Sequence, residues 1–184
     1  MLSNPFQALE PDHLRRLRWF EAHAGEEVGF PAPLGPGLHL AGKAKGIYKP
    51  KGLDHALSIR LNKLGPYEDG GFRGRTDGGW TLEYAQEGDP EKPPSETFTN
   101  RGLMKCMKDQ IPVGVLEQIE TKPRSRYLVR GLALPTDWQH GVFTFESAPA
   151  GTLTDSNSES REFRETAEEL ERSEQPMVTS DVDA

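Results

Sequence analysis

The sequence predicts an α+β fold, in which a twisted, mostly antiparallel sheet curls into an open barrel and helices pack outside it. Three observations favour this fold class. The 184 residues include 19 glycines and 15 prolines, which indicates many turns and short strands. Several short segments alternate apolar and polar residues, as half-buried strands do. Two other segments carry apolar residues at helical spacing.

The first predicted element is an amphipathic helix over residues 11–24. Pro11 and Asp12 suit its first turn, and Gly25 follows as a stop. A second helix is predicted over residues 100–108, capped by Thr99. The apolar residues expected to face the core are Leu14, Leu17, Phe20 and Ala24 in the first helix, and Leu103, Cys106 and Met107 in the second.

Six segments are predicted to be strands. Alternation is clearest in residues 56–61, with Leu57 and Ile59 on one face, and in residues 80–84, with Trp80 and Tyr84 on one face. The predicted strands are residues 38–42 (the weakest), 56–61, 80–84, 113–119, 127–134 and 141–146. Two loops, Gly65–Gly79 and Gln86–Phe98, adjoin the 80–84 strand, and loops on a rigid scaffold commonly carry binding residues.

The composition divides the chain into three parts. Residues 1–37 form a helix and loop that pack on the barrel, residues 38–149 form the main domain, and residues 150–184 read as an acidic linker or disordered tail. Residues 151–184 hold ten acidic and three basic residues, which accounts for the whole net charge of −7. The remaining 150 residues are neutral, so nucleic acid would bind only where their positive charges gather on one face.

The single cysteine, Cys106, excludes an internal disulfide framework, and its predicted place is the core. Neither a secretory signal nor a membrane span is evident, so we expect a cytoplasmic protein. A zinc site is not expected because the five histidines are scattered and there is no Cys-x-x-Cys pair. No metal or other cofactor is predicted.

An ordered series of motifs over residues 38–146 resembles the SRA (YDG) family of the PUA-like superfamily. The matching segments are Gly46-Ile47-Tyr48-Lys49-Pro50, Ala56-Leu57-Ser58-Ile59, Gly65-Pro66-Tyr67-Glu68-Asp69-Gly70, Tyr84-Ala85-Gln86-Glu87-Gly88, Thr99-Asn100-Arg101-Gly102-Leu103, Pro112–Leu116, Tyr127–Leu132, Trp138 and Gly141–Phe143. The resemblance implies an SRA/PUA-like curved barrel that flips 5-methylcytosine or 5-hydroxymethylcytosine out of duplex DNA.

The sequence looks most like the SRA-like domains at the N-terminus of bacterial modification-dependent HNH restriction endonucleases. That likeness implies a specificity module without enzyme activity of its own. Its implied partners are modified double-stranded DNA, a nuclease domain or subunit, and a second copy of the chain.

By the same resemblance, Tyr67 and Tyr84 stack on the flipped base and Asp69 accepts a hydrogen bond from its exocyclic amine. Ala85 or Ser58 borders the recess for the 5-substituent. From the residues alone, Tyr67 and Asp69 also fit an ordinary turn, and Tyr84 also fits the core. The cations expected at the DNA backbone are Lys43, Lys45, Lys49, Lys51, Arg73 and Arg75.

Three departures from the family pattern limit what carries over. Gly65-Pro66 replaces the usual double glycine, and Gly70 replaces the second acidic residue after the tyrosine. Residues 89–96 are short and acidic where eukaryotic relatives have a long Asn-Lys-Arg finger that reads the partner strand. A preference for CpG or hemimethylated sites is therefore not predicted.

Two other functions stay open. Asp109, Glu120 and Lys122 mimic the Asp…Glu-x-Lys pattern of a metal-dependent nuclease, in which carboxylates surround Mg²⁺. An RNA-binding or regulatory PUA-like module is the other alternative, because a fold alone does not fix its ligand.

Overall fold

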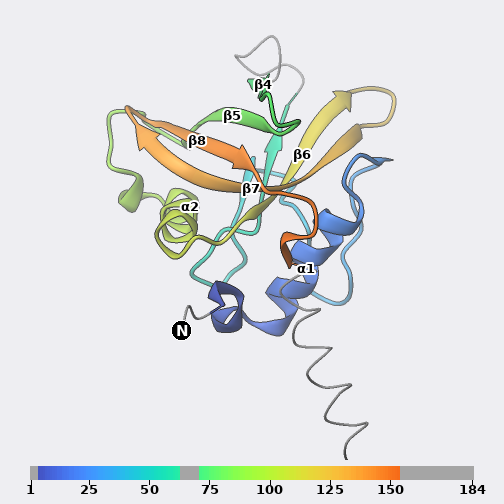
Figure 1. Cartoon of the computed structure of the whole chain (residues 1–184), viewed down its shortest axis with the longest axis horizontal. Coiled ribbons are helices and arrows are strands. Elements are labelled where there is room, and N and C mark those ends of the chain that lie inside the picture. Colours follow the sequence, from blue (N-terminus) through green and yellow to red (C-terminus); the bar gives the residue numbers. More distant parts are fainter. Residues whose placement is uncertain (1–3, 63–70, 154–184) are drawn as a thin grey trace, which may run out of the picture. The chain divides into compact units, whose positions relative to one another are not determined.

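The structure is a computed structural model, and it describes residues 4–62 and 71–153. The chain divides into two compact units, Met1–Ala150 and Gly151–Ala184. The first unit holds an eight-stranded sheet and two α-helices (Figure 1). The strands are β1 (Glu27–Val28), β2 (Ile47–Tyr48), β3 (Ser58–Leu61), β4 (Phe72–Gly74), β5 (Trp80–Ala85), β6 (Val113–Glu120), β7 (Arg126–Gln139) and β8 (Val142–Ser147).

The sheet runs in the order β2-β3-β6-β7-β8-β5-β4, with β1 paired to β7. Among the described strands, β3 and β6 make the one parallel pair and the others are antiparallel. This confirms the predicted α+β class with a curved, mostly antiparallel sheet. No described residue pairs β2 with β4, so the sheet is curved but not closed into a barrel.

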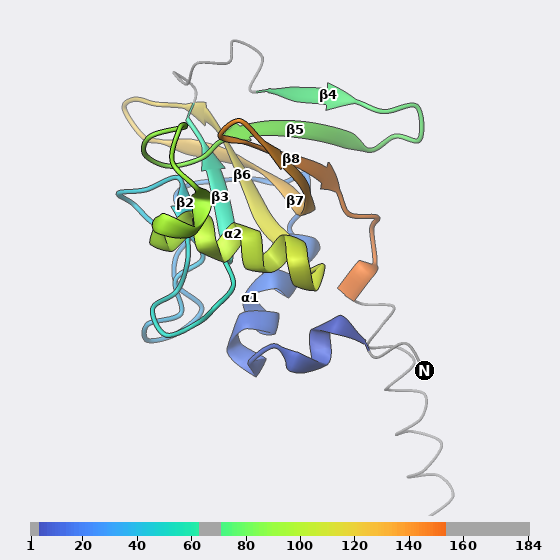
Figure 2. The same cartoon turned by 90° about the vertical axis from the view of Figure 1, so that its left-hand side faces the viewer.

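The two helices lie on the same side of the sheet in both views (Figures 1 and 2). Helix α1 (Pro11–Ala22) contacts β6 and β7, and helix α2 (Phe98–Asp109) contacts β7 and β2. Two short 3₁₀ helices, η1 (Pro5–Ala8) and η2 (Pro94–Glu96), precede them. The buried ring of Phe20 lies directly on Gly114 in β6, where an added Cβ would be 2.3 Å from the ring. A glycine therefore sets how closely α1 approaches the sheet.

Polar side chains are also buried on α1, which its apolar spacing did not predict. Arg16 is 3% exposed and donates to the carbonyl oxygens of His39 at 3.0 Å and Asp12 at 3.2 Å. His13 is buried beside it, and burial, with the charges of Arg16 and His55, lowers the pKa of His13 to about 4. His13 is therefore a neutral part of the core at neutral pH.

Several predicted elements need correction. Residues 38–42 do not form a strand, because the Leu40 carbonyl accepts from Ser58 Oγ at 2.7 Å in place of a ladder partner. Helix α2 begins two residues earlier than predicted, after Thr97, so Thr99 does not cap it. Strands β1, β2 and β4 were not predicted, and β7 continues to Gln139. The predicted inward residue Ala24 is exposed.

The cysteine is in the core, as predicted. Cys106 is fully buried and its thiol donates to the Ala56 carbonyl at 3.4 Å. Burial raises the pKa of the Cys106 thiol to about 12, so the group stays protonated and unreactive at neutral pH. Within residues 4–62 and 71–153, no helix is long and apolar enough to cross a membrane.

Candidate functional site

Tyr84 sits near the end of β5, opposite Phe143 of β8. Its side chain is partly exposed, and its ring meets the ring of Phe145 edge-on at a centroid distance of 6.4 Å. The hydroxyl donates to the Arg60 carbonyl at 3.2 Å. Burial, reinforced by the negative charge of Glu87, raises the pKa of Tyr84 to about 12, so the phenol remains a hydrogen-bond donor. Tyr84 is thus a flat side chain that is fixed at its tip and partly open to solvent.

The segment 63–70, which holds Tyr67 and Asp69, lies outside the described residues. The residues that flank this segment both contact β5. The backbone carbonyl of Arg60, near the end of β3, accepts a hydrogen bond from the Tyr84 hydroxyl. Phe72, the first residue of β4, pairs with Leu82 of β5. Both flanks therefore meet β5 within two residues of Tyr84. The stacking role of Tyr67 and the acceptor role of Asp69 stay predictions.

The two residues proposed for the 5-substituent recess have different surroundings. Ala85 is exposed and pairs with Val142 of β8. Ser58 is 1% exposed, and its hydroxyl is engaged with the Leu40 carbonyl. Ser58 thus anchors the chain before β2, and either role in the recess stays a prediction.

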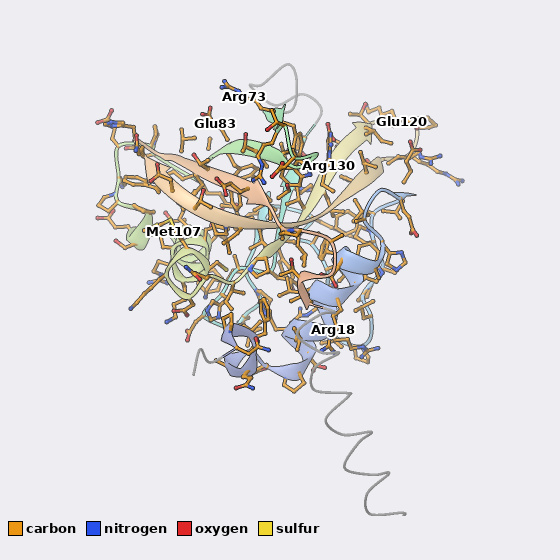
Figure 3. The ribbon with its side chains drawn as sticks, in the orientation of Figure 1. Arg18, Arg73, Glu83, Met107, Glu120 and Arg130 are labelled. Carbon is orange, nitrogen blue, oxygen red and sulfur yellow. The ribbon has the colours of Figure 1, made fainter. Side chains whose placement is uncertain are left out.

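A cluster of side chains from four strands, called the buttress below, packs against Phe72 of β4, the strand that follows segment 63–70. The guanidinium of Arg130 in β7 lies 4.1 Å from the centre of the Phe72 ring, and Phe72 packs edge-on against Trp80 at 5.0 Å. Glu117 of β6 holds Arg130 with contacts of 2.6 Å and 2.7 Å. Arg130 lies in the part of the molecule far from the helices, near the hairpin formed by β4 and β5 (Figure 3). The sequence offered no signal for this buttress, because its parts come from four strands.

The turn after β5 is fixed by Glu87 and Asn100. Asn100 is fully buried in α2, and its side-chain amide accepts from the Glu87 N–H at 2.9 Å and donates to the Glu87 carbonyl at 2.8 Å. The Glu87 carboxylate accepts from the Ile47 N–H at 3.2 Å and from the Thr99 hydroxyl at 2.5 Å. Glu87 therefore ties the end of β5 to both β2 and α2.

Gln86 stabilises the rest of this turn from the inside. It is 7% exposed, and its side-chain nitrogen donates to the carbonyl oxygens of Asp89 at 2.8 Å and Lys92 at 3.0 Å. Its side-chain oxygen accepts from the indole N–H of Trp138 at 2.8 Å. Sequence analysis missed Gln86, Glu87 and Asn100 as a unit, although they lie in motifs that carried the family resemblance.

Replacing Asn100 by alanine is expected to lower the free energy of unfolding by about 2–4 kcal/mol. The substitution leaves the N–H and the carbonyl of Glu87 without their partners, and each buried unpaired group costs about 1–3 kcal/mol. Urea unfolding followed by circular dichroism measures the change. Arg101→Ala, at the exposed next position of the same helix, is the matched control and should stay within about 0.5 kcal/mol of wild type. Equal stability of the two variants would contradict the prediction.

The lysines predicted at the DNA backbone surround β2. Lys43 and Lys45 precede it, and Lys49 and Lys51 follow it. Gly46, next to Lys45, touches the Tyr84 hydroxyl, so the start of this lysine run adjoins Tyr84. Lys45 Nζ is 3.7 Å from Glu87, and Lys49 Nζ is 3.7 Å from the centre of the exposed Phe98 ring.

The two predicted arginines follow segment 63–70. Arg73 is exposed on β4 and lies at the end of the molecule away from the helices (Figure 3). Arg75 is bound by Asp77, and its other nitrogen lies 3.7 Å from Glu146. Arg73 is therefore better placed than Arg75 to meet a phosphate, although DNA contacts by either stay a prediction.

Asp109, the first residue of the nuclease-like pattern, is engaged in other contacts. Asp109, at the end of α2, is paired with His55 at 2.8 Å and with Lys105 at 3.1 Å. The hydrogen bond from His55 contributes most to lowering the pKa of Asp109. Glu120 ends β6, where it is exposed and pairs with Arg126. Across residues 4–62 and 71–153, no group of three or more His, Cys, Asp or Glu side chains is arranged to hold a metal ion.

No sequence profile of a known protein family matches this chain. No curated protein sequence matches it either. Among solved structures, it is similar to the SUVH5 SRA domain in complex with fully methylated CG DNA, at 24% identity and a TM-score of 0.43, over 70% of this chain and 92% of that one.

Two structures of KRYPTONITE are also similar, one with mCHG DNA and SAH, the other with mCHH DNA, an H3(1-15) peptide and SAH. Their identities are 15% and 17%, and their TM-scores are 0.38 and 0.37. The matches cover 75% and 77% of this chain but only 43% and 38% of the KRYPTONITE chains. Because these similarities are distant, the function of this chain has to be inferred from its own residues.

Proposed function

We propose that this chain binds duplex DNA containing 5-methylcytosine or 5-hydroxymethylcytosine and holds the modified base, flipped out of the helix, against Tyr84. We further propose that it is the specificity module of a modification-dependent restriction endonuclease, with the cleaving activity in another domain or subunit. The observation that carries the proposal is the convergence of both flanks of segment 63–70 on β5 beside Tyr84. This convergence supports the proposed two-sided base pocket, in which Tyr67 would supply the second ring.

The energetics explain why two aromatic rings are needed. Taking one base out of the stack costs a few kcal/mol, and stacking on one aromatic side chain returns about 1–3 kcal/mol. A single ring therefore only offsets the cost of flipping. A second ring from Tyr67 and a carboxylate acceptor from Asp69 supply the surplus and recognise the amine on the cytosine edge.

The charge distribution fits selective binding better than general DNA affinity. Residues 1–150 carry as many acidic as basic residues, so few cations are available to displace counterions from DNA. The lysines around β2 and Arg73 on β4 stand on either side of Tyr84 in the sheet order. Contacts from these cations to phosphates would orient the duplex, while the pocket supplies the preference for a modified base.

The test is a binding comparison on four matched duplexes that carry cytosine, 5-methylcytosine, 5-hydroxymethylcytosine or glucosylated cytosine at one position. We expect the 5-methyl or the 5-hydroxymethyl duplex to bind at least tenfold more tightly than plain cytosine at 150 mM salt, roughly the discrimination that 1.4 kcal/mol provides. The glucosylated duplex measures the size of the recess. Equal affinity for all four duplexes would refute the proposed function.

The same preparation separates the two alternatives. Mg²⁺-dependent cleavage of the duplexes, lost in Glu120→Ala, would identify a nuclease in this chain. Tighter binding to RNA than to any of the four duplexes, unaffected by Tyr84→Ala, would identify an RNA-binding module.

A further inference from the structure

Gly46 lies directly under the tip of Tyr84, although it belongs to a different edge of the sheet. An added Cβ at Gly46 would be 2.1 Å from the Tyr84 hydroxyl oxygen, 3.1 Å from the Arg60 carbonyl oxygen and 3.4 Å from Tyr84 Cζ. The first distance is far inside van der Waals contact, so no other residue fits here without displacing Tyr84. Gly46 precedes β2, whereas Tyr84 is on β5 at the other end of the sheet order.

Hydrogen bonds connect Gly46, Arg60 and Tyr84 into one unit. The Arg60 N–H donates to the Gly46 carbonyl at 2.8 Å, and the Tyr84 hydroxyl donates to the Arg60 carbonyl at 3.2 Å. The backbone N–H and carbonyl of one residue in β3 thus hold the glycine and the tyrosine tip next to each other. Because the phenol oxygen lies on the axis of the Cβ–Cγ bond, fixing this oxygen fixes the direction of that axis and therefore where the ring lies.

We propose that Gly46 is a specificity-determining positioning residue, which sets where the Tyr84 ring lies for stacking on a flipped cytosine. The inference rests on the proposed function and adds to it a residue that touches neither base nor phosphate. Stacking loses its overlap when the ring tilts, and a binding site displaced by about 1 Å commonly loses its function. A side chain at position 46 would push the hydroxyl off the Arg60 carbonyl and tilt the ring away from its stacking position.

The chemistry suggests a rescue experiment. Gly46→Ala is expected to reduce the ratio of affinities for modified and plain duplexes at least tenfold, with affinity for plain duplex unchanged. Tyr84→Phe removes the clashing oxygen, and the next ring atom is then 3.4 Å from the new Cβ, an ordinary contact distance. Gly46→Ala combined with Tyr84→Phe should therefore recover part of the ratio shown by Tyr84→Phe alone, because the 3.1 Å contact with the Arg60 carbonyl oxygen remains.

Gly42→Ala is the matched control. An added Cβ at Gly42 would make ordinary contacts of 3.5 Å with the Lys45 carbonyl oxygen and with a Tyr48 ring carbon. Gly42 is in the same loop before β2, so this variant reports on general disturbance of the loop. We expect Gly42→Ala to keep the wild-type ratio of affinities.

Thermal unfolding of the wild type, Gly46→Ala, Tyr84→Phe and the double variant keeps the inference testable if Gly46→Ala folds poorly. The clash predicts that the loss of melting temperature in Gly46→Ala is smaller when Tyr84 is already phenylalanine. Strictly additive losses would overturn the inference, as would an unchanged affinity ratio in a folded Gly46→Ala protein. A wild-type protein without any preference for modified DNA would instead overturn the proposed function, whatever the coupling between residues 46 and 84.

Discussion

Replacing Tyr84 by alanine is expected to weaken binding to the modified duplex about 5- to 150-fold, the range that corresponds to the 1–3 kcal/mol of one stacked base. Binding to the plain duplex should change little, because its cytosine stays in the helix. The side chain of Tyr84 is partly exposed, and both flanks of segment 63–70 contact β5 at Tyr84 or within two residues of it. Titrations of both duplexes at one salt concentration measure the two changes.

Two variants show whether the aromatic ring is responsible. Tyr84→Phe keeps the ring but loses the hydrogen bond to Arg60, which is worth about 1 kcal/mol, so it should fall between wild type and Tyr84→Ala. Thr81→Ala alters the opposite face of the same strand, next to Glu146 of β8, and should bind both duplexes as wild type does. An equal loss for both duplexes in a folded Tyr84→Ala protein would mean that Tyr84 supports the fold without contacting the base.

Replacing Phe20 by alanine is expected to lower the free energy of unfolding by about 3–5 kcal/mol, the usual cost of removing a buried phenylalanine ring. Phe20 is fully buried, covers Gly114 of β6 and meets Trp19 edge-on at 5.2 Å. A domain of this size is stable by about 5–15 kcal/mol, so the variant should be near the limit of folding. Urea unfolding monitored by tryptophan fluorescence gives the value.

Arg18→Ala is the control for this prediction. Arg18 is exposed on the same helix and points away from the sheet (Figure 3), so its loss should change stability by less than about 0.5 kcal/mol. If Phe20→Ala were as stable as Arg18→Ala, α1 would not belong to the core, and residues 1–37 would be an appendage to the sheet.

The fold was predictable where the periodicity of the sequence matched burial. The apolar spacing of residues 11–24 located α1, and the alternation in residues 80–84 located β5. Residues 38–42 were wrongly predicted to form a strand. Leu40 and Ala41 are buried within a loop, and buried loop residues give the same apolar signal as a strand. Strand β4 was missed because its glycine-rich surroundings read as a loop, and its stability comes from Phe72 packing against Arg130 and Trp80.

The candidate site was predictable only in part. Tyr84 was found through a motif, and the structure gives it a partly exposed position at a strand end. The residues that hold it in place could not be found in this way, because Gly46, Arg60 and Asn100 act through backbone atoms of distant segments. Periodicity reports which face of an element is buried, but it carries no record of such pairings across the chain.

The pairing of β5 with β8 has a consequence for the assembly of the protein. The strand that carries Tyr84 is made before β6, β7 and β8, yet one of its two partners in the sheet is β8 (Val142–Ser147), the last of the described strands. Contacts between such distant segments form slowly, since the intervening chain must first be brought together. During synthesis, the strand that bears Tyr84 cannot pair with β8 until residue 147 has emerged from the ribosome, so the sheet around Tyr84 is complete only in the finished domain.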